Sequence, residues 1–348
     1  MLELPSIPEL NEEARRAARL RLDDLTKPQG SLGRLEDLAA HLAAITGEAL
    51  PELPKKAAVL MAADHGVAEE GVSAFPQEVT AQMVANFARG GAAMSVLSRH
   101  VGAELVVVDI GVARDLPLIP GVLSRKVAYG TRNFTRGPAM TRQEAERAVA
   151  VGLEVAREVV GRGARLVALG DMGIANTSAS TAIAAVYSGL PVAELTGRGT
   201  GVDDERLKKK IRCLEQALAE NRPDPRDAWD VLCKVGGLEI AGLAGVAIGV
   251  AAARGAVLVD GLISAAAALI AVGLAPPVRD YLLASHQSAE PAHRVMLELM
   301  GLKPILFMDL RLGEGTGAAL VMPIVEAAVK ILREMATFGE AGVSNREA

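Results

Sequence analysis

One repeated unit recurs along this chain: a short apolar segment, then a polar or acidic residue and glycine, then a helical segment. Short apolar segments that end at glycine are typical of strands buried on both faces of a sheet. The apolar segments are residues 57–66, 104–111, 165–173, 256–261, 281–288 and 304–313. The helical segments are residues 78–100, 141–161, 177–188, 203–220, 238–254, 262–272, 290–300 and 318–336. This alternation predicts an α/β fold with a parallel sheet of about six strands flanked by helices and joined by right-handed crossovers.

The first part of the chain differs from this pattern. Residues 1–48 contain two charged amphipathic helical segments on either side of the turn Lys27-Pro28-Gln29-Gly30. We predict a small helical domain made of residues 1–48 with part of 318–348, which is therefore discontinuous. Residues 49–317 are then a large α/β domain that carries the active site.

Composition excludes nucleic acid as a partner. Half of the 348 residues are hydrophobic, which is enough for a sizeable core. Only 5 Phe, 3 Tyr and 1 Trp are present, too few for platforms on which single-stranded bases stack. The net charge of −5 provides no overall positive field for a phosphate backbone, so any anionic ligand must be bound locally.

The sequence predicts neither a membrane protein nor a secreted one. Residues 261–278 carry no charge, but they are rich in alanine and are interrupted by Pro276-Pro277, which favours a helix packed on a sheet. Gly245 and Gly249 have the spacing of a membrane dimer motif and are interpreted in the same way. Two cysteines without zinc or redox spacing, and a charged N-terminal segment without an apolar signal core, indicate the cytoplasm.

Polar residues recur where the expected strands end. In open parallel sheets, ligands bind beyond the carboxyl ends of the strands. Any single aspartate at such a position could be a helix cap, but a shared site is the better explanation of the whole set. The polar clusters are residues 64–66, 109–111, 170–178, 260–261, 285–288 and 311–317.

Three glycine-rich turns lead into helices and suit an anion such as phosphate. They are residues 170–178, 197–201 and 311–317. The second is followed by Lys208, Lys209 and Lys210, which either add positive charge to the site or form a solvated helix face. The second and third turns lack the spacings GxGxxG and GxxxxGK[ST], and no acidic residue follows a first-strand fingerprint at the usual distance, which disfavours the usual NAD and ATP sites.

Glu314 lies inside the third glycine-rich turn, where its carboxylate would repel a phosphate. It is either a structural cap for the helix that begins near residue 318 or a base that faces another part of the ligand. His65, His286 and His293 match no metal-ligand spacing, so structural or hydrogen-bonding roles and no metal are expected. Ser285 and Ser288 lack the GxSxG motif of serine hydrolases.

Seven segments, in order along nearly the whole chain, resemble one enzyme family, the nicotinate-nucleotide–dimethylbenzimidazole phosphoribosyltransferases. They are LTKPQGSLGRLE (25–36), ADHGVAEEGVSAFPQEVTAQMV (63–84), GTRNFTRGPAMT (130–141), GDMGIANTSAS (170–180), CKVGGLEIAGLAG (233–245), SHQSAE (285–290) and RLGEGTGAALVMPIVEAA (311–328). The resemblance implies transfer of phosphoribose from nicotinate mononucleotide to 5,6-dimethylbenzimidazole, which gives α-ribazole 5′-phosphate and nicotinate. It also implies a Rossmann-like large domain, a homodimer with the site near the interface, and no cofactor.

The resemblance assigns roles to individual residues. Glu314 matches the catalytic base of the family. The residues that match positions around the nucleotide and its phosphate are Gly173, Asn176, Thr177, Ser178, Gly199, Lys210, Ser288, Arg311 and Gly313. The residues expected around the accepting base are Phe75, Met83, Asp171 and Met172.

The expected base pocket departs from the family pattern. Phe75 and Met83 stand where relatives can carry polar residues, and Asp171 stands where a longer Glu can occur. Transfer to another base, either a purine or a phenolic compound, is therefore the main alternative. A nucleotide-binding protein without catalysis and a dehydrogenase on the same fold are the other two, since a fold alone does not define a function.

Overall fold

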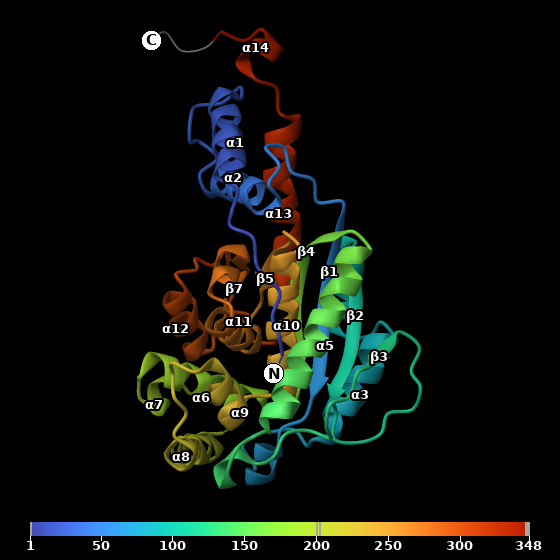
Figure 1. Ribbon diagram of the computed structural model, residues 1–348, viewed down its shortest axis with the longest axis vertical. Coiled ribbons are helices and arrows are strands. Elements are labelled where there is room, and N and C mark those ends of the chain that lie inside the picture. Colours follow the sequence, from blue (N-terminus) through green and yellow to red (C-terminus); the bar gives the residue numbers. More distant parts are fainter. Residues whose placement is uncertain (1, 200, 202, 345–348) are drawn as a thin grey trace.

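The computed structural model describes residues 2–199, 201 and 203–344, in which helices and strands alternate (Figure 1). The strands are β1 (Lys55–Ala63), β2 (Glu104–Gly111), β3 (Val122–Ser124), β4 (Ala164–Met172), β5 (Ala256–Val259), β6 (Leu282–Ala284), β7 (His286–Gln287) and β8 (Leu306–Phe307). The α-helices are α1 (Glu12–Asp24), α2 (Arg34–Thr46), α3 (Glu78–Ala88), α4 (Ala93–Val101), α5 (Arg142–Gly161), α6 (Asn176–Ser188), α7 (Val192–Leu195), α8 (Asp204–Asn221), α9 (Ala228–Val235), α10 (Leu238–Ala252), α11 (Leu262–Leu274), α12 (Pro291–Met300), α13 (Thr316–Glu334) and α14 (Phe338–Ala341).

The main sheet has six parallel strands in the order β3-β2-β1-β4-β5-β6. The two central strands, β1 and β4, are almost fully buried, as expected when helices cover both faces of a parallel sheet. The predicted α/β fold class is confirmed. Because all six strands run in one direction, their carboxyl ends meet at one edge.

Two predicted elements differ from the structure. Residues 304–313 do not add a strand to the main sheet; only β8 forms there, and it pairs with β7 in a separate two-stranded sheet. Phe307 and Met308 are exposed and Asp309 has a φ of 51°, so this segment cannot continue as a buried strand. The sixth strand of the main sheet is instead the short edge strand β3. The expected helix 78–100 is divided into α3 and α4 at Gly90, whose φ is 81°.

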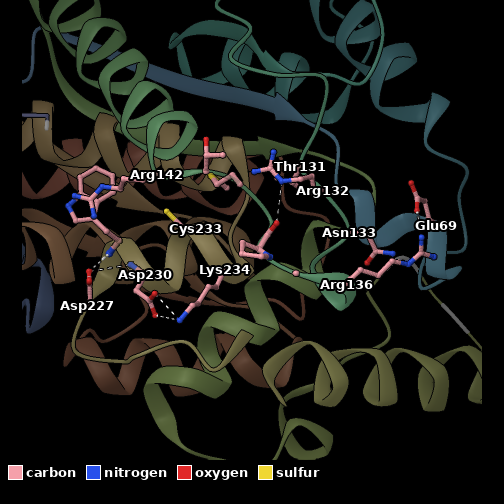
Figure 2. Close-up of a pocket in the computed structure, with 15 residues that line it drawn as sticks. Glu69, Thr131, Arg132, Asn133, Arg136, Arg142, Asp227, Asp230, Cys233 and Lys234 are labelled. Atoms are coloured by element: carbon pink, nitrogen blue, oxygen red, sulfur yellow. Dashed lines mark hydrogen bonds and ion pairs between the residues drawn. The ribbon is translucent and has the colours of Figure 1, made fainter. Parts of the chain in front are cut away.

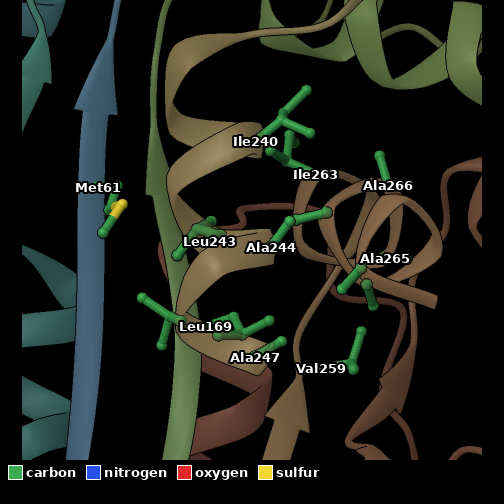
Figure 3. Close-up of a cluster of buried hydrophobic side chains, with 14 of the residues drawn as sticks. Met61, Leu169, Ile240, Leu243, Ala244, Ala247, Val259, Ile263, Ala265 and Ala266 are labelled. Atoms are coloured by element: carbon green, nitrogen blue, oxygen red, sulfur yellow. The ribbon is translucent and has the colours of Figure 1, made fainter. Parts of the chain in front are cut away.

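The core is built around α10, which lies between the sheet, α5 and α11. Small residues allow this close approach: a Cβ on Gly242 would lie 2.2 Å from the sulfur of Met61 in β1, and a Cβ on Gly245 would lie 2.1 Å from the carbonyl oxygen of Val149 in α5. Figure 3 shows side chains of α10 between strands β1 and β4 on one side and α11 on the other. Among the described residues, no helix combines the length and apolar character needed to cross a bilayer.

Helices α1 and α2 lie beside the C-terminal half of α13 (Figure 1). A second, separate cluster of buried side chains joins these three helices. Its buried members are Ala18, Leu22, Leu25, Ala39, Ala40, Ala43, Ala328 and Leu332. Helix α13 thus begins beside the carboxyl ends of the strands and ends in this cluster, so it connects the two parts of the molecule.

Candidate active site

Three strands deliver buried aspartates to the carboxyl edge of the main sheet. Asp64 directly follows β1, Asp171 is the penultimate residue of β4, and Asp260 directly follows β5. Each is at most 4% exposed. Ion pairs of these aspartates with Lys or Arg are not found among the described residues. The carboxyl edge of the sheet therefore contains three acidic side chains that are largely shielded from water.

Glu314 lies above this edge, in the turn that precedes α13. Glu314 and its neighbours Gly313 and Gly315 all have positive φ angles, of 62°, 82° and 96°. The turn packs tightly on β4, because a Cβ on Gly170 would lie 2.4 Å from the Glu314 carbonyl oxygen. The Glu314 carboxylate accepts a hydrogen bond from the Met94 N–H at the start of α4, at 3.3 Å.

The cap of α13 is Asp260 and not Glu314. The Asp260 carboxylate accepts hydrogen bonds from the N–H groups of Gly315 and Ala318, at 3.1 and 2.9 Å. The residue before α13, Gly315, makes no side-chain cap of its own. Of the two roles considered for Glu314, that of a structural cap for this helix is therefore wrong.

The surroundings of the edge raise the pKa values of its carboxyl groups. Burial raises the pKa of Glu314, and the charge of Asp260 raises it further. Burial also raises the pKa of Asp260 to about 7. The pKa of Asp171 lies well above its usual value, first because of burial and then because Asp260, Glu239 and Glu314 are close. Groups with raised pKa values hold a proton more readily and are suited to general base catalysis near neutral pH.

A second cluster surrounds the start of α6. The Lys210 ammonium donates a hydrogen bond to the Thr177 hydroxyl at 2.8 Å, and a Cβ on Gly199 would lie 3.0 Å from that same hydroxyl. Lys210 is 1% exposed, and burial lowers its pKa to about 8. Lys208 and Lys209 are exposed. The three turn and helix segments that carry these groups thus meet around one buried cation.

Glu290 lies beside this cation. Its carboxylate accepts a hydrogen bond from the Gly199 N–H at 3.0 Å, and its charge counteracts the lowering of the Lys210 pKa. Ser178 is fully buried, and its hydroxyl has no protein hydrogen-bond partner among the described residues. The start of α6 therefore carries a buried hydroxyl whose hydrogen-bonding capacity is not used by the described residues.

The two clusters are linked through α6. Asn176, the first residue of this helix, donates a hydrogen bond from its side chain to Asp171 at 3.0 Å. Gly173 lies between them and packs on β1, because a Cβ there would lie 2.3 Å from the Ala63 carbonyl oxygen. Gly313 packs against the Asp171 carboxylate, whose oxygens would be 3.4 Å from a Cβ at that glycine. The structure thus brings Glu314, Gly313, Asp171, Asn176, Thr177, Gly199 and Lys210 into one continuous network.

The remaining predicted residues lie nearer the surface. Arg311 is exposed, and Phe75 is 52% exposed in the loop before α3. Met83 and Met172 are half-buried. Ser288 is buried, and its N–H donates to His293 Nδ1 at 3.0 Å. No contact places Phe75 or Arg311 directly in the network within the described residues of this single chain.

Sequence reasoning expected a structural or hydrogen-bonding role for His65, but it did not identify two groups behind the site, Glu239 and the Met94 N–H. His65 Nε2 and Glu239 Oε1 are 2.6 Å apart and fully buried, and Glu239 is close enough to Asp171 to raise its pKa. The Met94 N–H is the other group, since a backbone donor carries no mark in the sequence.

Burial lowers the pKa values of His286 and His293 to about 4 and about 3, so both are neutral near pH 7. Within the described residues, no three His, Cys, Asp or Glu side chains are grouped as metal ligands.

A large cavity lies elsewhere, between residues 131–142 and 227–234 (Figure 2). Its volume is about 1080 Å³, and none of the predicted site residues lines it. Its cations already have partners: Lys234 pairs with Asp230 at 2.9 Å, and the Arg142 guanidinium lies over the Trp229 ring at 4.3 Å. We therefore place the candidate active site at the buried carboxylates and Lys210, on chemical grounds rather than by volume.

Comparison with known proteins identifies the class first. A family model described as phosphoribosyltransferase matches residues 7–343, and the chain belongs to this family. A relative from Chloroflexus aggregans is 57% identical over 97% of this chain and 96% of its own length, and one from Geobacter sulfurreducens is 58% identical over 98% and 97%. Both are named nicotinate-nucleotide–dimethylbenzimidazole phosphoribosyltransferase, so the family predicted from the seven segments is confirmed. A crystal structure of CobT from Thermus thermophilus is 50% identical, with a TM-score of 0.92 over 96% of this chain and 100% of that one.

Proposed function

We propose that this enzyme transfers phosphoribose from nicotinate mononucleotide to 5,6-dimethylbenzimidazole, with Glu314 as the base, and releases nicotinate and α-ribazole 5′-phosphate. One observation carries the assignment of the base: a buried carboxylate of raised pKa is held in a rigid turn, and no ion pair to Lys or Arg engages it within the described residues. The family membership of the chain supports the two substrates.

The chemistry of the reaction needs such a base. The leaving nicotinate is a cationic pyridinium at the glycosidic bond, so its departure requires no general acid. As a benzimidazole nitrogen bonds to C1′, positive charge grows on the ring and its N–H becomes acidic. The Glu314 carboxylate stabilises this charge and takes the proton, a role worth typically about 10²–10⁴-fold in rate.

The stereochemistry follows from the same displacement. The benzimidazole attacks the face of C1′ opposite to the nicotinate, which inverts the β-nucleotide to an α-product. Much of the remaining rate enhancement then comes from holding two flat rings on opposite faces of the ribose.

The cluster around Lys210 is proposed as the phosphate site. Lys210 provides the charge, Thr177 and Ser178 provide hydroxyl groups, and the start of α6, which no side chain caps, provides the positive end of the helix dipole. Gly173, Asn176 and Gly199 are proposed to line the same phosphate site. Ser288, Arg311 and Gly313 are proposed to lie around the nucleotide.

Phe75, Met83, Asp171 and Met172 are proposed as the base pocket. Phe75 and the two methionines provide a mainly apolar surface, which favours a methylated benzimidazole, and Met83 adapts to the shape of the ring. Asp171 lies within the charged network and faces Glu314. These pocket residues are also compatible with the alternative function, transfer of phosphoribose to a purine or a phenolic base.

We also propose the wider setting of the enzyme. The separate core of α1, α2 and α13 supports a small helical domain made of residues 1–48 and part of 318–348, beside the large domain 49–317. Phe307, Met308 and Leu312, each more than half exposed beside the Glu314 turn, support a homodimer interface near the site. The free thiols of Cys213 and Cys233 support a cytoplasmic location.

A chromatographic assay tests the reaction. The protein is incubated with nicotinate mononucleotide and 5,6-dimethylbenzimidazole, and nicotinate and α-ribazole phosphate are quantified. We expect equal amounts of both products, and a loss of at least about 10²-fold in the Glu314→Gln variant. Glu334→Gln is the matched control and should retain full activity, because Glu334 is an exposed carboxylate at the end of α13, the helix that follows the Glu314 turn.

Each other outcome has a distinct meaning. Full activity of Glu314→Gln would remove Glu314 as the base and leave the reaction in place. Product formation with a competing purine or phenol, but not with the benzimidazole, would replace the acceptor. Absence of any product with all bases would contradict the transferase assignment for this chain.

A further inference from the structure

Asp260 is a fully buried carboxylate to which the proposed reaction gives no role. It directly follows β5 and is 0% exposed. Its oxygens accept the N–H groups of Gly315 and Ala318, which belong to the turn and first helical residues after Glu314. Among the described residues, its carboxylate is 3.7 Å from His286 Nδ1, and burial keeps that ring neutral. The Glu314 turn is therefore the main hydrogen-bonding partner of Asp260.

The same turn is held on two further sides. Gly170 of β4 lies under the Glu314 carbonyl oxygen, with no room for a Cβ. Gly317 lies against the His286 ring, whose Nδ1 would be 2.1 Å from a Cβ there. Of the three consecutive residues with positive φ, only Glu314 has a Cβ and is strained in that conformation, so these contacts help to hold the turn in its shape. Of these three supports, Asp260 is the one that carries a charge.

The groups that face Glu314 come from three elements. Asp260 approaches from the end of β5 and Asp171 from the end of β4, and both are acidic. The Met94 N–H approaches from α4 and donates to the Glu314 carboxylate. The charge of Asp260 disfavours the ionised form of Glu314, which makes Glu314 a stronger base than an isolated glutamate.

We propose that Asp260 is a positioning residue for the transfer reaction: by binding the N–H groups of Gly315 and Ala318, it fixes the turn that aims the Glu314 carboxylate at the acceptor. Its charge acts on Glu314 in the same direction, since it favours transfer of the proton from the benzimidazole. This inference rests on the proposed role of Glu314 as the base. Asp260 itself does not touch the substrate in this arrangement.

The test compares Asp260→Asn with the wild-type enzyme in the chromatographic assay. An amide removes the charge and can accept only one of the two N–H bonds. We expect kcat to fall by about 10- to 10²-fold, because a displaced base reacts slowly, while KM for nicotinate mononucleotide changes by less than about threefold. We also expect the rising limb of the pH profile of kcat to move to lower pH, because loss of the Asp260 charge lowers the pKa of Glu314.

Two further variants separate positioning from simple structural damage. Asp260→Glu restores the charge and should recover part of kcat and the position of the pH limb. Ser264→Ala removes a buried hydroxyl at the start of α11 that bonds the Gly261 carbonyl oxygen and not the α13 turn. It should leave the pH limb unchanged.

A double-mutant cycle gives the decisive readout. If Asp260 acts through Glu314, the change Asp260→Asn should have no further effect on the residual rate of Glu314→Gln. Independent, multiplicative losses would overturn the proposal. So would an unchanged kcat and pH limb in Asp260→Asn while Glu314→Gln is inactive, and that result would leave the base assignment intact. Full activity of Glu314→Gln would instead identify a failure of the base assignment itself.

Folding is monitored by thermal unfolding of every variant. Asp260→Ser is the second neutral variant, because its small hydroxyl can still accept one N–H bond. The fall in kcat and the shift of the pH profile to lower pH must both occur in whichever neutral variant folds. If neither variant folds, Asp260 is a determinant of folding and the proposal is wrong.

Discussion

Lys210 is the residue whose environment most constrains its role. A lysine that is 1% exposed and bonded to a threonine hydroxyl loses most of its hydration, and a bound phosphate would compensate for this loss. We expect Lys210→Met to raise KM for nicotinate mononucleotide by about 10- to 10²-fold, with a smaller change in kcat, as for loss of a charged hydrogen bond. Lys208→Met, an exposed lysine on the same helix, is the control. Equal KM values in the two variants would remove Lys210 from the phosphate site.

The same lysine predicts a pH dependence of substrate binding. Burial lowers the pKa of Lys210 to about 8, so its positive charge is present below that pH and is lost as the pH rises through it. In the wild-type enzyme, Kd for nicotinate mononucleotide should therefore increase above about pH 8. In Lys210→Met, titration calorimetry should show a weak affinity that does not change over this range. A parallel pH dependence in both proteins would contradict the assignment.

The sequence names many site residues but not their partners. Lys210 and Thr177 are 33 residues apart and meet only because α6 and α8 pack together, so their contact could be expected from the family resemblance alone. Glu314 remained ambiguous because a cap and a base occupy the same place in a turn. The structure excludes the cap role, since Asp260 bonds the N–H groups of α13. Backbone donors such as the Met94 N–H have no side-chain identity and could not be predicted.

Among the elements, the pair α5 and α10 depends on glycines at its contact. A Cβ on Gly245 would lie 2.1 Å from the Val149 carbonyl oxygen and 3.0 Å from the Gly152 Cα, both of which are backbone atoms that cannot easily move. We expect Gly245→Ala to destabilise the protein by about 1–3 kcal/mol, as for overpacking of a core. Gly161→Ala is the control: it lies in the last turn of α5 with open space around it, and alanine there should be neutral or stabilising. Urea denaturation measures both, and an unchanged midpoint for Gly245→Ala would show that the helices can separate without cost.

The order of helices and strands could be predicted because buried elements leave a periodic pattern of apolar residues in the sequence. The prediction failed for elements that are not fully buried. Strands β1, β2, β4, β5 and β6 are apolar and were all expected. Edge strand β3 is three residues long and partly exposed, so its sequence does not differ from that of a loop. Residues 304–313 look like a strand in the sequence, but their apolar side chains are largely exposed and only β8 forms.

For the whole molecule, the buried titratable groups are concentrated at the carboxyl edge of the sheet and make opposing contributions to stability. The raised pKa values of Asp64, Asp171, Asp260 and Glu314 mean that the folded state binds protons more tightly than the unfolded chain. Their contribution therefore decreases as the pH rises above the ordinary carboxyl value. The buried histidines His286 and His293, whose pKa values are lowered, act in the opposite direction. The carboxyl groups thus lower the stability of the folded protein as the pH rises, and these histidines lower it as the pH falls. Such a stability cost is expected where titratable groups are buried for catalysis.

His293 allows one of these opposing contributions to be measured. Burial lowers its pKa from the ordinary 6.5 to about 3, so between these values the unfolded chain takes up a proton that the folded protein does not. The contribution of His293 to the free energy of unfolding must then fall as the pH decreases below about 6.5. Its slope is about 1.4 kcal/mol per pH unit. His293→Gln removes the titration while its amide oxygen can still accept the Ser288 N–H. We expect the difference in unfolding free energy between wild type and variant, from denaturation at a series of pH values, to show this slope.

The matched control is His100→Gln, because His100 is exposed at the end of α4 and so differs in its degree of burial from the groups at the carboxyl edge. Its difference from the wild type should be flat over the same pH range. A flat difference for His293→Gln as well would mean that water or a proton reaches the His293 ring in the folded protein. The carboxyl edge would then be more hydrated than its burial indicates, and the raised pKa of Glu314, on which the proposed base depends, would lose its physical cause.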